Sequence, residues 1–272
     1  MNKERESLHI RINLDAPVNG LIRRLRHAND NLRFGLACDV GSVEDVSAPS
    51  MTGITYAIGG AEIRDLDRLR TGFRSWVIAS ALRDSIEALL LYLDEVRKVS
   101  VLLSYGPTVD LTSDEWNATL VRGQKQFHRL GLRRKLDALK QIDESLQSEY
   151  EEEIATINRA RNCLVHRFGA VTDEDTDGTD RLTVRWRKNE IVAEIDGTPT
   201  PIGPGFVAKD VTPLYLHQNV PVSKEFSIGE TILLSADEFG ELSWTVIVFA
   251  VHFREKVETF GLSRGVVPRE VG

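Results

Sequence analysis

The stretch FRSWVIASALRDSIEALLLYLDEVRKVSVLLS (73–104) carries the most regular apolar pattern in the chain. Its apolar residues recur every three or four positions, as they do on one face of a helix. These residues are Leu82, Ile86, Leu89, Leu93, Val96 and Leu103, and Leu90 and Leu91 widen the face. The pattern predicts a long helix that needs packing partners on more than one side.

Further helices are expected on the C-terminal side of this stretch. A turn at 106–107 contains Gly and Pro, and the helix start that follows at 112–115 has Thr and Ser ahead of Asp and Glu. A basic stretch (125–140) and an acid-led segment (149–168) continue the helical part. The chain therefore predicts a mainly α-helical fold, built as an antiparallel bundle.

The N-terminal third is expected to be a small α/β extension. Residues 8–14 alternate apolar and polar side chains like a short strand, and Pro17 opens a helix. The apolar residues of this helix are Leu21, Ile22, Leu25, Leu32 and Phe34. Residues 39–60 are rich in Gly, Ser and Thr, which predicts a loop with one strand at 54–58.

The periodicity changes to two after an acidic loop at 173–180. Residues 182–187 alternate, and a second alternating run at 191–195 follows Lys188 and Asn189, which predicts a hairpin with further short strands up to about Leu234. The chain then divides into an N-terminal extension (1–72), a helical core (73–172), a β-rich insertion (173–234) and a C-terminal part (235–272). In this last part Ser235 and Glu238 form a capping-box pattern, and an apolar helical run reaches Phe260.

Charge and composition restrict the class of function. With 272 residues, 42% of them hydrophobic, the chain can bury a sizeable core. A net charge of -7 argues against coating nucleic acid by bulk charge, so any RNA contact is expected to be focal. Two cysteines, a charged N-terminus without a signal-peptide core and the charges within 76–103 predict a soluble cytoplasmic protein without a bilayer span.

The run NRARNCLVH (158–166) closes the acid-led segment with an arginine, an amide and an imidazole. On an ideal helix Arg161 falls in the middle of the apolar face, where an unpaired guanidinium costs several kcal/mol, so an acceptor is expected. Asn162 and His166 share another face, and His166 is roughly 140° from Arg161. These groups converge only if the arginine reaches around, the last turn distorts, or a second copy completes the site. A structural role at the helix C-terminus is the other interpretation.

ArgAsnCysLeuValHis (161–166) resembles the Arg-Asn-x-x-x-His signature of HEPN domains. This helical family occurs in many bacterial toxin and defence ribonucleases and in RNA-targeting CRISPR effectors. The resemblance covers about residues 73–170 and 235–262. It implies a metal-independent and cofactor-free endoribonuclease, in which two motif copies face each other across a homodimer. An antitoxin or another regulatory protein is a further possible partner.

The resemblance also implies roles for the motif residues. His166 would act as general acid or base in attack by the ribose 2′-hydroxyl, Arg161 would stabilise the phosphorane charge, and Asn162 would orient the phosphate. An imidazole and a fork of fixed donors suit this chemistry. Some members carry a tyrosine two residues after the histidine, where this chain has Phe168. That departure puts in doubt the specific arrangement in which an antitoxin modifies the tyrosine.

The alternative is a non-catalytic helical interaction or RNA-binding module, because the family also contains members that only bind or scaffold. In that case Arg161 would pair with a carboxylate of the long helix, either Asp84 or Glu87. The two hypotheses make opposite demands on the motif. An enzyme needs Arg161 and His166 exposed in a cleft that faces a second copy. A module needs Arg161 buried in an intrachain salt bridge while His166 points to open solvent.

Several weaker patterns have ordinary structural interpretations. Asp173, Asp175, Asp177 and Gly178 match half of a calcium loop, but Val184 stands where a bidentate Glu belongs, which favours a solvated acidic turn. No other residues are expected to bind a metal.

Two basic stretches could contact RNA. Residues 185–188 interleave basic side chains with Trp186, which is typical of a single-strand RNA platform or of a tryptophan that packs a hairpin while the basic residues face water. His128 stands among Lys125, Arg129, Arg133, Arg134 and Lys135, which predicts a phosphate-tracking face or a solvated helix face. His252 and Cys163 are expected in or near the core.

Overall fold

A computed structural model describes residues 12–38, 66–107, 115, 117–195, 198–203 and 214–267 of the chain. The strand expected at 54–58 lies outside these residues, as does most of the strand expected at 8–14. The helix start expected at 112–115 also lies outside them, apart from Glu115.

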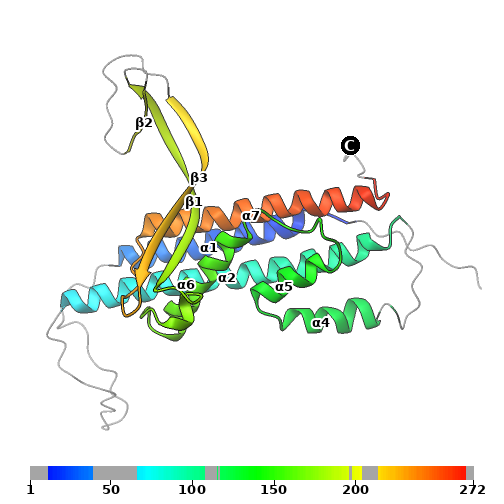
Figure 1. Ribbon diagram of the computed structural model, residues 1–272, viewed down its shortest axis with the longest axis horizontal. Helices are drawn as coiled ribbons and strands as arrows, with labels where there is room; N and C mark the ends of the chain where they lie inside the picture. The colour runs from blue at the N-terminus through cyan, green and yellow to red at the C-terminus, as the bar shows by residue number, and fades with distance from the viewer. Residues whose placement is uncertain are drawn as a thin grey trace, which may run out of the picture.

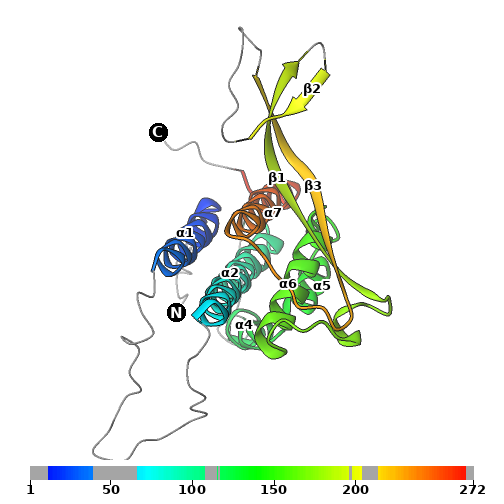
Figure 2. The same cartoon turned by 90° about the vertical axis from the view of Figure 1, so that its left-hand side faces the viewer.

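Three long helices form the body of the protein. They are α1 (Asp15–Ala37), α2 (Leu66–Ser104) and α7 (Ala236–Ser263), which lie side by side in both views (Figures 1 and 2). The prediction of a mainly helical protein is confirmed. The stretch 73–104 is helical throughout, and α2 begins earlier than expected, at Leu66.

The three long helices do not alternate in direction, as they would in the antiparallel bundle that was expected. The Tyr92 hydroxyl donates to the Ala250 carbonyl at 2.8 Å, and eleven residues further along both helices Gly261 lies against Leu103. The helices α2 and α7 are therefore parallel. Their parallel course is possible because the segments between α2 and α7 bring the chain back to the end where α2 began. Of the three long helices, α1 runs antiparallel to the other two (Figure 1).

The apolar face of α2 is buried along most of the helix, as its width predicts. Its most enclosed residues contact α1 and α7 on one side and the shorter helices on the other, and they include Leu82, Ile86, Leu89 and Leu93. The capping box at the start of α7 is confirmed, since the Glu238 amide donates to the Ser235 hydroxyl and the Glu238 carboxylate accepts from the Ser235 amide. One expected core residue of α1, Phe34, is exposed.

Four shorter helical elements follow α2. They are a π-helical turn η2 (Asn117–Arg122), α4 (Gly123–His128), α5 (Leu132–Lys140) and α6 (Glu151–His166), followed by a 3₁₀ turn η3 (Asp173–Asp175). Of these elements, α4, α5 and α6 pack against α2. Three glutamates open α6, where the helix dipole favours negative charge. The helix ends at His166, and the following residues Phe168 and Gly169 adopt positive φ angles of 54° and 84°.

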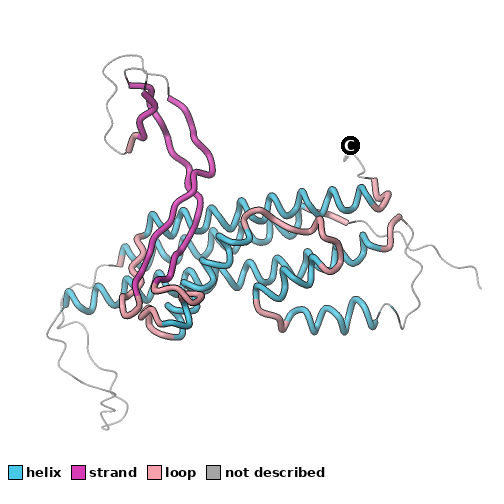
Figure 3. The backbone as a smooth tube through the Cα atoms, viewed as in Figure 1, coloured by secondary structure: helices cyan, strands magenta, loops and turns pink. Residues whose placement is uncertain are grey.

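The β segment is a three-stranded antiparallel sheet with the order β2-β1-β3. Its strands are β1 (Arg181–Ile195), β2 (Thr198–Pro201) and β3 (Leu214–Ser227). One end of the sheet rests on the helices, and the other projects from them (Figure 3).

The hairpin turn predicted at Lys188 and Asn189 is wrong, because β1 continues through these residues with a register shift before Glu190. There the Asn219 amide donates to the Asn189 side chain at 3.2 Å, so the bulge satisfies polar groups that a turn would have exposed.

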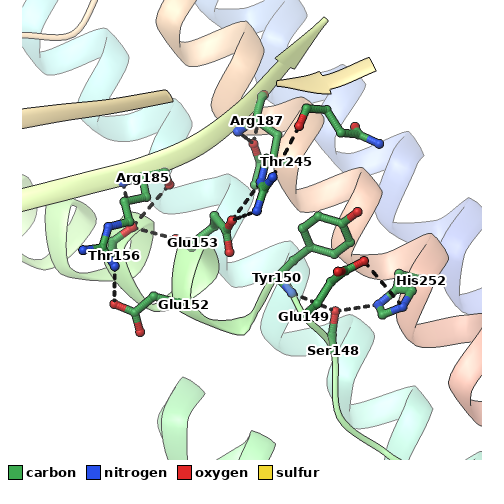
Figure 4. A network of polar contacts seen from close by, with 11 residues as sticks. Ser148, Glu149, Tyr150, Glu152, Glu153, Thr156, Arg185, Arg187, Thr245 and His252 are labelled. Atoms are coloured by element: carbon green, nitrogen blue, oxygen red, sulfur yellow. Dashed lines mark hydrogen bonds and ion pairs between the residues drawn. The ribbon is translucent and has the colours of Figure 1, made fainter. Parts of the chain in front are cut away.

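Polar contacts fix the base of the sheet against α6 and α7 (Figure 4). The Arg187 guanidinium bonds the Glu153 carboxylate at 2.8 Å from Nε, and the Thr245 hydroxyl bridges to the Arg187 backbone. Trp186 is buried beside them, as predicted, and donates to Glu241 at 2.6 Å. The expectation that the neighbouring basic residues face water is wrong for Arg187, because a carboxylate on α6 compensates its partial burial.

Replacing Glu153 with glutamine is expected to reduce the free energy of unfolding by about 2–3 kcal/mol, because it leaves Arg187 partly buried without a charged partner. Urea unfolding followed by circular dichroism measures this loss. The control is Glu152→Gln on the same turn, where the exposed pair with Arg185 contributes less than about 1 kcal/mol. Equal losses in both variants would contradict the importance of the Glu153 contact.

Candidate functional site at the end of α6

The motif residues occupy the last two turns of a regular helix. Because α6 stays helical as far as His166, Arg161 and His166 point roughly 140° apart, as on an ideal helix. The last turn does not distort to bring them together. Within one protomer, therefore, the structure unites Arg161 with Asn162 and leaves His166 separate.

The Arg161 guanidinium has three different environments around its nitrogens. Nη1 donates to the Asn162 side-chain oxygen at 3.0 Å, and Nη2 lies 3.7 Å from Glu87 Oε1 on α2. Nε is enclosed without a hydrogen-bond partner. The acceptor expected for this arginine is therefore present, and Glu87 is one of the two carboxylates predicted, whereas Asp84 pairs with Arg83. The Arg161 side chain is 18% exposed and the Glu87 side chain 56%, so the ion pair lies at the surface.

His166 is exposed and has no hydrogen bond or ion pair to any residue that the structure describes. The chain turns sharply after it, as the Gly169 amide donates back to the Cys163 carbonyl at 3.1 Å. Phe168, between them, is 94% exposed. The end of α6 thus exposes both an imidazole and, two residues later, an aromatic ring.

Basic groups from α1 extend the surface around Glu87. A groove of about 510 Å³ between α1 and α2 is lined by Arg23, Arg24 and His27 on one side and by Asp84 and Glu87 on the other. Glu87 lines this groove and also lies beside Arg161. The sequence had marked these α1 residues only as part of a helix.

A second cluster of charged groups lies further along α2, and sequence reasoning missed it. The buried Asp94 carboxylate bonds Lys135 Nζ through Oδ1 and lies 2.6 Å from His128 Nδ1 through Oδ2. Lys135 is only 1% exposed and also donates to the Phe127 carbonyl at 3.0 Å. Its assignment to a surface basic face is therefore wrong. Burial lowers the pKa of Lys135, and the hydrogen bond that Lys135 donates to Asp94 opposes this shift.

The acidic loop at 173–180 is fixed by arginines. Asp175 is buried, contrary to the expectation of a solvated turn, and accepts from Arg167 and from the Thr172 amide at 3.0 Å. Asp177 pairs with Arg159 instead. The carboxylates therefore point to different partners, and within the described residues no group of three or more His, Cys, Asp or Glu side chains could hold a metal ion.

The remaining candidates lie in or near the core, as predicted. The Cys163 thiol is buried and donates to the Ala170 carbonyl at 3.2 Å, and burial raises its pKa to about 11. His252 lies 2.9 Å from the Ser148 hydroxyl, edge-on to the Tyr150 ring (Figure 4).

Comparisons with protein-family models, with curated proteins and with solved structures each found no match. Among the described helices, none is long and apolar enough to cross a membrane.

Asp175 is expected to contribute pH-dependent stability. Burial disfavours its charge, but the bonds from Arg167 and Thr172 prevail and hold the pKa of Asp175 below its ordinary value of 3.8. A carboxylate with a lowered pKa stabilises the fold above that ordinary value, and this contribution disappears as the pH falls through the lower folded value. Asp175→Asn should therefore lose about 2–3 kcal/mol at neutral pH and much less near pH 2.5.

Urea unfolding at the two pH values measures this difference. The control is Asp173→Asn in the same turn, an exposed residue whose replacement should change the free energy of unfolding by less than about 0.5 kcal/mol. A loss in Asp175→Asn that stays the same at both pH values would refute the role given to ionised Asp175.

Proposed function

We propose that the protein is a metal-independent endoribonuclease of a bacterial toxin or defence type, with Arg161, Asn162 and His166 as its active groups. The observation that carries this proposal is the end of α6, where His166 is exposed and has no partner among the described residues. It stands about one and a half turns from the Arg161 guanidinium, which is held only by Asn162 and by Glu87 at 3.7 Å. The resemblance of these residues to the HEPN signature supports the choice of RNA as substrate.

The proposed reaction is transesterification at phosphorus. His166 removes the proton of a ribose 2′-hydroxyl, whose oxygen attacks the adjacent phosphorus. The bond to the 5′-oxygen breaks, this oxygen takes up a proton from the imidazolium or from water, and a 2′,3′-cyclic phosphate remains. Arg161 donates to the phosphorane oxygens while their charge develops, and Asn162 holds the guanidinium in place.

A second copy of the chain is part of this proposal. Arg161 and His166 diverge within one protomer, so each would act with the partner copy's motif across a homodimer interface. The exposed Phe168 supports such an interface, because an aromatic ring that is 94% exposed, two residues after His166, would be stabilised if a second surface covered it. Its positive φ is a further cost that a functional role would explain. An antitoxin or another regulatory protein could cover the same surface.

A non-catalytic RNA-binding or interaction module is the second candidate, and the arrangement of the motif favours it. Arg161 is only 18% exposed and is paired with Glu87, while His166 is exposed to solvent, as that hypothesis predicts. An arginine so engaged needs no substrate. The pair is weak, however, because its atoms are 3.7 Å apart and Glu87 is largely exposed. A phosphate could therefore displace Glu87 at low cost.

Cleavage of labelled RNA by the purified protein in EDTA distinguishes the two candidates. Wild type should cleave to give 2′,3′-cyclic phosphate ends, and His166→Ala should lower the rate about 100-fold or more through loss of the acid–base group. Arg161→Ala should lower the rate by a similar factor because a charge-stabilising donor is removed.

The matched control is His217→Ala, which removes an exposed histidine of β3 and should leave the rate unchanged. Fold and dimer content must be equal in all variants. Absence of cleavage across several RNAs, or cleavage that both motif variants retain, would favour the non-catalytic module.

A further inference from the structure

Exposed basic side chains recur along η2, α4, the turn at Arg129 and α5, and we call the surface that they form the outer face of η2, α4 and α5. Five of them are exposed and have no side-chain hydrogen bond or ion pair to any residue in the described part of the chain, namely Arg122, Lys125, Arg129, Arg133 and Arg134. Many arginines elsewhere bond carboxylates, as Arg167 and Arg187 do. In a protein of net charge -7, such a surface is a local positive field that attracts a polyanion.

His128 stands among these residues, and its ring is held in one orientation. Nδ1 lies 2.6 Å from the buried Asp94 carboxylate, whose other oxygen is bonded by Lys135. The His128 side chain is nevertheless 64% exposed, and Nε2 has no partner among the described residues. With Nδ1 turned toward Asp94, Nε2 points outward and can exchange a hydrogen bond with a ligand without paying the entropy of fixing the ring.

Helix α2 connects this basic face to the motif. Asp94 and Glu87 are seven residues apart, which places them on the same face of the helix at a separation of roughly 10 Å along its axis. Asp94 orients His128, and Glu87 contacts Arg161. Arg133 on α5 also lies near α6. Burial is the main cause that lowers the pKa of Arg159, and the positive charge of Arg133 lowers it further.

We propose that the outer face of η2, α4 and α5 binds the phosphodiester backbone of single-stranded RNA and guides it along α2 toward Arg161. Guanidinium groups donate in pairs to phosphate oxygens, and the oriented Nε2 of His128 supplies a further fixed contact. Such contacts position a strand without reading its sequence. The choice of RNA as the polyanion rests on the proposed function, whereas binding at this face does not require cleavage.

Binding is measured by fluorescence anisotropy with a labelled 2′-O-methyl RNA, which lacks the attacking hydroxyl and stays intact. Arg129→Glu and Arg133→Glu should each weaken binding about tenfold near 0.1 M salt, because one phosphate contact is lost and a repulsive charge is gained. Each should also reduce the slope of log K against log salt concentration by about 0.7. His128→Ala should weaken RNA binding severalfold while the protein stays folded, because the fixed Nε2 contact is lost.

The matched control is Arg74→Glu, the same charge change at another exposed arginine that has no partner among the described residues. It lies about 30 Å from Asp94 along α2. It should change the affinity less than twofold. Equal weakening by Arg74→Glu and Arg133→Glu would overturn the proposal in favour of bulk attraction, and so would unchanged binding in the α4 and α5 variants. Loss of binding to phosphatidylserine vesicles in these variants, with RNA binding retained, would overturn it in favour of a lipid surface.

The two proposals fail separately in this design. If wild type binds the 2′-O-methyl RNA through α4 and α5 but does not cleave ordinary RNA, the ribonuclease is refuted and the binding face stands. If RNA is cleaved in a His166-dependent way while the α4 and α5 variants bind and cleave normally, the binding face is refuted and the ribonuclease stands.

Discussion

An apolar helix as long and as broad as α2 cannot be covered from one side, and the rest of the molecule is arranged around this constraint. Helices α1 and α7 cover one part of its surface, while α4, α5 and α6 cover another. Each short helix would be unstable alone in water and depends on α2 for the apolar area that it buries. The sheet depends on α2 indirectly, because its base packs on α6 and α7.

The charged residues of α2 decide how the short helices are held. Asp94 is buried and bonds Lys135 and His128, which ties α4 and α5 to the central helix. Two turns earlier, Glu87 reaches only the edge of Arg161 and remains largely exposed. The first contact is expensive to break because it would leave a buried charge unpaired, whereas the second is a surface pair of small value. The same helix face thus combines a rigid anchor with a replaceable contact.

Local signals predicted the parts of the structure that depend on neighbouring residues. The apolar spacing of 73–104 predicted α2, and the Ser235 and Glu238 capping box predicted the start of α7. The surface pair of Arg161 with Glu87 was predictable because a charged residue on an apolar face needs a partner on the next helix. The continuation of β1 through Lys188 and Asn189, where a turn was predicted, could not be predicted locally. It depends on Asn219 of the opposite strand, whose amide donates to the Asn189 side chain.

The burial of Lys135 could not be predicted for a similar reason. The carboxylate that accepts its hydrogen bond belongs to Asp94, which lies 41 residues away on α2. Spacing alone showed a basic helix face and could not reveal which of its members turns inward. The parallel course of α2 and α7 likewise depends on how the intervening segments return, and no local pattern in the chain reports it.

Photo-crosslinking of the protein to RNA in EDTA, followed by mass spectrometry of the crosslinked peptides, tests the central claim most directly. The claim is that RNA runs over the exposed basic side chains of η2, α4 and α5 toward Arg161 and His166 at the end of α6. Crosslinks should concentrate in peptides that span 122–134 and 161–168, and should compete with unlabelled RNA. Crosslinks confined to the projecting sheet, in peptides from 181–227, would contradict the account and place RNA on the β segment instead.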